Sequence, residues 1–157
     1  MAATGGKPRG SDARGSEGAP LSREVLGHLM GVMHAMKDHV AALAATLDVT
    51  PSQLAALSHL DEPRSQRELA ESLHFDASNI TDIVDRLEAR GLVVRTVDPN
   101  DRRVRRIVRT PEGEALRRKA LAEAIASAPT VAPLSEAEQR KLCDLLGKIA
   151  VPVELLF

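Results

Sequence analysis

Five arginines stand close together in this sequence, and their side chains could bind an acidic polymer. They are Arg102, Arg103, Arg105, Arg106 and Arg109. A guanidinium group binds phosphate oxygens through charge-assisted hydrogen bonds. Residues 95–119 hold nine basic and four acidic side chains, although the net charge of the whole chain is −1. A run of charge is most often solvated surface, but a run as dense as this one favours phosphate binding and insertion into a minor groove.

A second group of polar side chains precedes the arginines. Ser78, Asn79 and Thr81 are small, and their hydroxyl and amide groups can form hydrogen bonds to base edges or to phosphates. Ser and Asn are also favourable in the first turn of a helix, so this group alone leaves both explanations open. The neighbouring arginines shift the balance toward contacts with a duplex.

Three capping boxes mark helix starts. In each, a Ser or Thr is followed three residues later by Glu or Gln, and the pairs are Thr50 with Gln53, Ser65 with Glu68, and Ser135 with Glu138. The helix from residue 65 ends in a turn at residues 74–75, after which Asp76 can cap another helix. That helix has apolar side chains at i, i+3, i+4 and i+7, which must face inward: Ile80, Ile83, Val84 and Leu87. Gly91 is placed to end it. Two helices with a short turn between them predict a helix-turn-helix.

The segment that follows predicts a hairpin. Residues 92–97 and 104–110 are rich in β-branched side chains, and a turn at residues 98–101 lies between them. A hairpin placed after a helix-turn-helix is a wing, and this wing carries the arginine run.

The flanking segments predict a mostly helical protein. Residues 1–20 hold half of the ten glycines and no branched aliphatic residue, which predicts a disordered tail. Residues 21–48 predict a dimerisation helix, because their apolar side chains alternate spacings of three and four: Leu26, Leu29, Met33, Met36, Val40, Leu43 and Leu47. Residues 111–157 predict C-terminal dimerisation helices and an apolar tail. The expected fold is mainly α with a small β-hairpin wing, in which residues 50–110 form a winged helix-turn-helix lobe between dimerisation helices.

Several other classes of protein are disfavoured. The only aromatic residues are Phe75 and Phe157, so stacking on bases cannot be a major mode of binding. The single cysteine, Cys143, cannot form an internal disulfide, and neither a signal peptide nor a membrane-spanning segment is visible. The expectation is a soluble protein of the cytoplasm. No catalytic motif is present, and we expect neither enzyme activity, nor a cofactor, nor a metal site.

Taken together, these motifs resemble the MarR family of bacterial transcriptional regulators over roughly residues 22–150. The segments that carry the resemblance are Asn79-Ile80-Thr81, Val84-Asp85-Arg86-Leu87-Glu88, Gly91-Leu92-Val93, Arg95, Asp98-Pro99-Asn100-Asp101-Arg102-Arg103 and Thr110-Pro111-Glu112-Gly113. The resemblance implies a homodimer in which the second helix of the helix-turn-helix enters the major groove. It also implies that Arg103 reaches the minor groove, braced by Asp101.

The residues and the resemblance together predict contacts with double-stranded DNA. The expected contact residues are Ser65, Gln66, Ser78, Asn79, Thr81, Arg86, Arg95, Asp101, Arg102, Arg103 and Arg105. The expected function is a homodimeric, sequence-specific regulator of transcription that binds a pseudo-palindromic operator, as a ligand-responsive repressor. The alternative is a winged-helix module that binds an acidic protein partner and has no specific affinity for DNA.

Two positions depart from the family pattern. Asp82 stands where a basic or neutral residue is frequent; it could accept from a cytosine amino group, but an ion pair with Arg86 at i, i+4 is favoured. Arg109 stands where a buried leucine is usual, which leaves the packing of the second strand open, with Val108 as a substitute.

A small-molecule effector is common in such proteins, which often release DNA when aromatic acids or phenols bind between the dimer helices and the DNA-binding lobe. His28, His34 and His59 could line such a crevice. The alternative, which we favour, is that they are ordinary, partly buried histidines.

Overall fold

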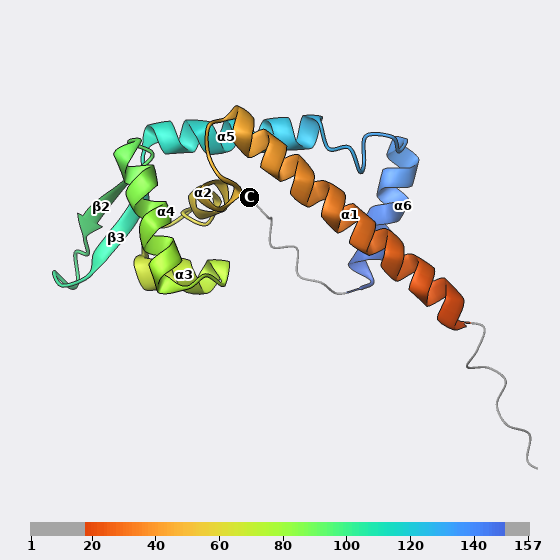
Figure 1. Cartoon of the computed structure of the whole chain (residues 1–157), viewed down its shortest axis with the longest axis horizontal. Helices are drawn as coiled ribbons and strands as arrows, with labels where there is room; N and C mark the ends of the chain where they lie inside the picture. The colour runs from red at the N-terminus through yellow and green to blue at the C-terminus, as the bar shows by residue number, and fades with distance from the viewer. Residues whose placement is uncertain (1–17, 150–157) are drawn as a thin grey trace, which may run out of the picture. The chain divides into compact units, whose positions relative to one another are not determined.

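A computed structural model describes residues 18–149 of the chain. The disordered tail was predicted at residues 1–20. Its residues 1–17, and the apolar tail predicted at residues 153–157, lie outside the described residues, whereas residues 18–20 belong to a helix and not to the tail. The described elements are α1 (Gly18–Thr46), α2 (Pro51–Ser58), β1 (Arg64–Ser65), α3 (Gln66–Leu73), α4 (Ala77–Ala89), β2 (Val93–Val97), β3 (Arg105–Arg109), α5 (Pro111–Ala126) and α6 (Glu136–Gly147). Their order confirms the expected fold class, with six helices and one small sheet in the described part (Figure 1).

The chain divides into two compact units, Met1–His34 and Ala35–Phe157. The first contributes the N-terminal part of α1 to the described residues. There the apolar seam is exposed, with Leu26 60% and Met33 64% accessible to solvent. The second unit contains the C-terminal end of α1 and all the other elements, and in it Leu43 and Leu47 of the same seam are buried.

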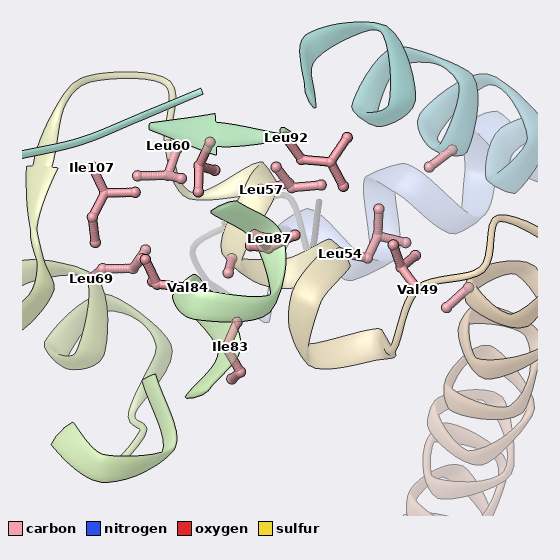
Figure 2. Close-up of a cluster of buried hydrophobic side chains, with 14 of the residues drawn as sticks. Val49, Leu54, Leu57, Leu60, Leu69, Ile83, Val84, Leu87, Leu92 and Ile107 are labelled. Carbon is pink, nitrogen blue, oxygen red and sulfur yellow. The ribbon is translucent and has the colours of Figure 1, made fainter. Parts of the chain in front are cut away.

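The core of the second unit gathers the apolar faces of the short helices around the sheet. Figure 2 labels ten side chains of this core: Val49, Leu54, Leu57, Leu60, Leu69, Ile83, Val84, Leu87, Leu92 and Ile107. The inward stripe predicted for the helix after residue 76 is confirmed, since all four of its side chains are buried in α4. Burial of this apolar area holds α4 against α2 and α3 and leaves its other face in solvent.

All three predicted capping boxes are formed, at Thr50, Ser65 and Ser135. Each cap satisfies backbone N–H groups that the first turn of a helix cannot pair internally. Asp76 occupies the N-cap position of α4 as predicted, but its side chain makes no capping hydrogen bond. His74 ends α3 in the left-handed conformation, with φ 54° and ψ 39°. Gly91, with φ 70°, follows α4 in the same region of conformation, where a residue without a side chain is favoured.

The sheet has three antiparallel strands in the order β1-β3-β2, rather than the two predicted. β2 and β3 form the wing, and β1 pairs with the other edge of β3, Arg64 opposite Ile107 and Ser65 opposite Arg106. A strand of two residues has no periodicity of its own, so it could not be read from the sequence. Its consequence is that β3 is hydrogen-bonded on both sides, and the wing is continuous with the start of α3.

Gly113 brings α5 against the wing. Thr110 caps α5, accepting from the Gly113 N–H at 3.1 Å and donating to the Gly91 carbonyl oxygen at 2.7 Å. A Cβ on Gly113 would overlap the Leu92 carbonyl oxygen and lie 3.0 Å from the carbonyl carbon of that residue. Only glycine allows this approach between the first turn of α5 and the residue before β2.

Candidate DNA interface

The exposed start of α4 carries two polar side chains that are free to bind an outside partner. Ser78 and Asn79 are exposed, and neither side chain has a hydrogen bond to any other described residue. The opposite face of α4 is fixed in the core by Ile80 and Val84, both fully buried. The helix therefore holds a hydroxyl and an amide outward on a rigid support.

Three other predicted contact residues are used inside the protein. Thr81 donates from its hydroxyl to the Ala77 carbonyl oxygen at 2.8 Å and accepts from the Gln66 side-chain amide. That bond joins α3 to α4. Ser65 caps α3, with its backbone N–H bound to a Glu68 carboxylate oxygen at 2.7 Å. Sequence reasoning placed all three on the surface that faces DNA; it predicted the cap at Ser65 but did not anticipate the bond between Gln66 and Thr81.

The connection between β2 and β3, residues 98–104, is an ordered turn, which we call the wing loop. Asp98 organises it: one carboxylate oxygen accepts from the N–H of Asn100 at 2.7 Å and from that of Asp101 at 3.3 Å. Its backbone N–H donates to the Val104 carbonyl oxygen at 3.1 Å. Asp101 in turn accepts from the N–H of Arg103 at 2.9 Å. The brace implied for Arg103 thus acts on its backbone, and its guanidinium is left free.

Arg102, Arg103 and Arg105 form the outward basic group of the wing. All three are exposed, and none of their guanidinium groups has an ion pair within residues 18–149. An unpaired, exposed guanidinium keeps its full capacity to bind phosphate. These three side chains, rather than the whole arginine run, make the basic surface of the wing.

Arg95 and Arg106 are held by carboxylates of the protein. Arg95 binds Asp85 at 2.5 Å and also Glu88, both on α4, so it connects β2 to α4. Arg106 binds Asp98 through its Nε at 2.5 Å and Glu68 through a terminal nitrogen. Arg95 was predicted to contact DNA, but we propose no such contact, because both of its terminal nitrogens already bind carboxylates of the protein.

Arg109, which stands where the family usually has a buried leucine, is itself largely buried and is neutralised by carboxylates of the protein. Its side chain is 11% exposed and pairs with Glu114 at 2.7 Å and Asp61 at 3.3 Å. It also donates to the Leu57 carbonyl oxygen at 2.5 Å. The apolar packing of β3 comes from Ile107, which is fully buried, and not from Val108 as predicted.

The predicted ion pair between Asp82 and Arg86 is absent from the described residues. Both side chains are exposed on α4. An exposed i, i+4 pair contributes only about 0.3–0.5 kcal/mol, which is too little to hold two solvated side chains together reliably. Within the described residues, the guanidinium of Arg86 therefore remains available to a phosphate, and Asp82 remains an unpaired negative charge on α4.

The three histidines predicted as ligand contacts are divided between the two units of the chain. His28 pairs with Glu24 at 3.8 Å on α1, and His34 lies further along the same helix, both within Met1–His34. His59 is the C-cap of α2 in the other unit. Within the described residues, no group of three or more His, Cys, Asp or Glu side chains could hold a metal ion. There, too, no single helix is long and apolar enough to cross a membrane; residues Pro20–Thr46 and Pro51–Ser58 reach that length only as a bent pair.

The protonation of Asp98 gives the wing a dependence on pH. The hydrogen bond from Arg106, followed by that from the Asn100 N–H, holds the pKa of Asp98 below its usual value. A carboxyl whose pKa is lowered by folding stabilises the fold above its unfolded pKa, about 3.9. That stabilisation is lost as the pH falls through the folded value.

We therefore expect acid to destabilise the wild type through Asp98. The Asp98→Asn protein should unfold more easily at pH 7, and its free energy of unfolding should fall less steeply between about pH 5 and pH 2. Urea denaturation at a series of pH values measures both. Asp82→Asn is the control, because Asp82 has no ion pair in the described structure. If the free energy of unfolding fell equally steeply with pH in the wild type and in Asp98→Asn, the role of Asp98 would be contradicted.

The fold and this interface define a winged helix-turn-helix protein. Residues 47–104 match the sequence model of the MarR family. A protein of Thauera aromatica, whose name links it to regulation of the hcr operon, is 32% identical over 148 residues, which cover 92% of this chain and 89% of the relative. The repressor MdtR of Bacillus subtilis (strain 168) is 34% identical over 109 residues, or 68% of this chain and 70% of that protein.

A solved structure adds a protein seen with DNA. A mutant of MepR from S. aureus bound to an oligodeoxyribonucleotide is 25% identical, has a TM-score of 0.59, and matches 81% of this chain and 94% of its own. The chain belongs to the MarR family of transcriptional regulators.

Proposed function

We propose that this regulator is a homodimeric, sequence-specific repressor that binds a pseudo-palindromic operator in double-stranded DNA. The observation that carries the proposal is the pairing of two free surfaces on one rigid lobe. The start of α4 holds Ser78 and Asn79 outward, and the wing holds Arg102, Arg103 and Arg105 outward. The first can read base edges in a major groove, and the second can bind backbone phosphates and enter a minor groove. Both are binding surfaces, so we propose no enzymatic role.

The apolar surfaces outside this lobe support a dimer. A single chain leaves large apolar side chains in solvent on three helices: Leu21, Val25, Leu26, Met30, Val32 and Met33 on α1, Ile125 on α5, and Leu145 and Leu146 on α6. Apolar patches of this kind on a soluble chain mark association surfaces. We propose that a two-fold axis relates two copies, which sets their recognition helices about one turn of DNA, roughly 34 Å, apart.

Three finer features belong to the same proposal. The repressor role is supported by the relatedness to MdtR, which is a repressor. Release from DNA would be triggered by a small-molecule effector, for which His28, His34 and His59 remain the candidate contacts. The expected site of action is the bacterial cytoplasm.

The decisive experiment is to select binding fragments from the organism's own genomic DNA and sequence them. We expect a shared half-site repeated in inverted orientation, and an affinity that falls steeply with salt. Asn79→Ala should change the preferred base at one position of each half-site, where a good amide contact contributes about 1–3 kcal/mol of discrimination.

The matched control is Asn100→Ala, which removes the same side chain from the wing loop. It should leave the base preference unchanged. If no fragment is enriched and affinity for duplex DNA does not depend on salt, the protein-interaction module is the better description.

A further inference from the structure

Arg106 stands between two carboxylates that belong to different parts of the DNA-binding lobe. Its Nε donates to Asp98 in the wing loop at 2.5 Å, and a terminal nitrogen pairs with Glu68 in the first turn of α3. The Asp98 side chain is 7% exposed and that of Arg106 is 28% exposed. Figure 1 shows the two elements that are joined here, the hairpin of β2 and β3 and the helix α3.

Each carboxylate already organises its own element. Asp98 fixes the wing loop through the N–H groups of Asn100 and Asp101. Glu68 completes the cap of α3 by accepting from the Ser65 N–H. The guanidinium between them therefore connects two ordered turns, and the connection continues through Asp101 to the backbone of Arg103.

We propose that Arg106 is a positioning residue for DNA binding. Asp98, Arg106 and Glu68 form a clasp that fixes the wing loop against the start of α3, and so sets where the wing arginines stand relative to the recognition helix α4. This rests on the proposed function, because it concerns how that interface is held in register. In this proposal Arg106 acts through the two carboxylates that hold its Nε and one terminal nitrogen, and not through a phosphate contact of its own.

The clasp and simple charge attraction predict opposite effects for Glu68→Gln. Glutamine can serve at this position of a capping box, so the cap of α3 is kept while the charge is lost. Simple attraction predicts tighter DNA binding, because a negative charge is removed and a guanidinium is freed for phosphate. The clasp predicts weaker binding, by about threefold to tenfold, because the wing loses its fixed position.

Glu71→Gln is the matched control. Glu71 lies one turn further along α3, is exposed, and pairs only with the neighbouring Arg67 at 2.8 Å within the described residues. The substitution removes the same charge from the same helix without touching the clasp. It should bind DNA as well as the wild type or slightly better.

A double-mutant cycle tests whether Arg106 acts through the wing. If Arg106 works by placing the wing arginines, Arg106→Met should weaken DNA binding by a smaller factor in an Arg103→Ala background than in the wild type. Losses that multiply would show instead that Arg106 makes its own contact. The probe is the duplex selected by the wild-type chain, or a duplex of random sequence at low salt if selection gives none.

Hydrogen exchange of the protein alone decides the clasp without DNA. Glu68→Gln and Arg106→Met should exchange the wing-loop amides of Asn100, Asp101, Arg103 and Val104 at least threefold faster than the wild type, while Glu71→Gln should not. Equal exchange in Glu68→Gln and Glu71→Gln, or tighter DNA binding by Glu68→Gln than by Glu71→Gln, overturns the clasp. If the wild type binds no duplex, but Glu68→Gln and Arg106→Met still exchange the wing-loop amides faster than the wild type, the proposed function is overturned and the clasp is supported.

Discussion

Replacing Arg102 and Arg103 together by alanine should weaken binding to the selected duplex by about 100-fold near 0.1 M salt. Both guanidinium groups are exposed and have no ion pair in the described structure, so each can displace a counterion from a phosphate. The slope of the logarithm of the binding constant against the logarithm of salt concentration should fall by about two for each bound chain. Fluorescence anisotropy titrations at salt concentrations from about 50 to about 300 mM measure both the affinity and its dependence on salt.

The control must remove two positive charges elsewhere. Arg140 and Lys141 are adjacent and exposed on α6, outside the winged helix. Changing both to alanine should alter the affinity by less than about threefold, because the effect of distant exposed charges is screened. Similar losses in the two double variants would mean that total charge, and not the wing, governs binding.

Gly113→Ala should have the largest effect on stability among single methyl additions to this chain. The added Cβ would overlap the Leu92 carbonyl oxygen, which also accepts from the Thr110 N–H at 3.1 Å. Neither backbone can move without breaking the junction of β2, β3 and α5. We expect the free energy of unfolding to fall by about 3 kcal/mol or more, as for a severely overpacked site.

Two other glycines give graded controls for that measurement. Gly91 has no neighbour within 4 Å of an added Cβ but has φ 70°, so its alanine variant should lose only about 1–2 kcal/mol. Gly147 in α6 has neither restriction, and alanine there should be neutral or stabilising by up to about 1 kcal/mol. If urea denaturation gave Gly113→Ala and Gly147→Ala the same free energy of unfolding, the close approach of Gly113 to the Leu92 carbonyl oxygen would be contradicted.

Local features of the fold could be predicted because their partners lie within one turn of the chain. Each capping box contains both halves of its hydrogen-bonding pair, and the inward stripe of α4 follows from helical periodicity alone. Gly91 was placed correctly for the same reason. The strand β1 was missed, because its two residues are ordered only by pairing with β3, about forty positions later in the chain.

The division of the arginines could not be predicted from their spacing. The predicted contact set held Arg102, Arg103 and Arg105 and left out Arg106 and Arg109, although phosphate binding was inferred from the density of the whole run. Which guanidiniums are neutralised depends on tertiary neighbours: Glu68 lies 38 residues before Arg106, and Asp61 lies 48 residues before Arg109. For Asp82 and Arg86 the spacing predicted an ion pair that the described structure does not contain, because a favourable spacing does not by itself hold an exposed pair together.

The continuity between sheet and helix at Ser65 limits where this chain can change in length. Ser65 is both the last residue of β1 and the N-cap of α3, so no linker separates the two elements. An inserted residue there would shift the pairing of β1 with β3 by one position and displace the cap at the same time. Insertions, whether they arise in evolution or carry an engineered reporter, are better accommodated between α5 and α6, where residues 131–133 are exposed and belong to no helix or strand.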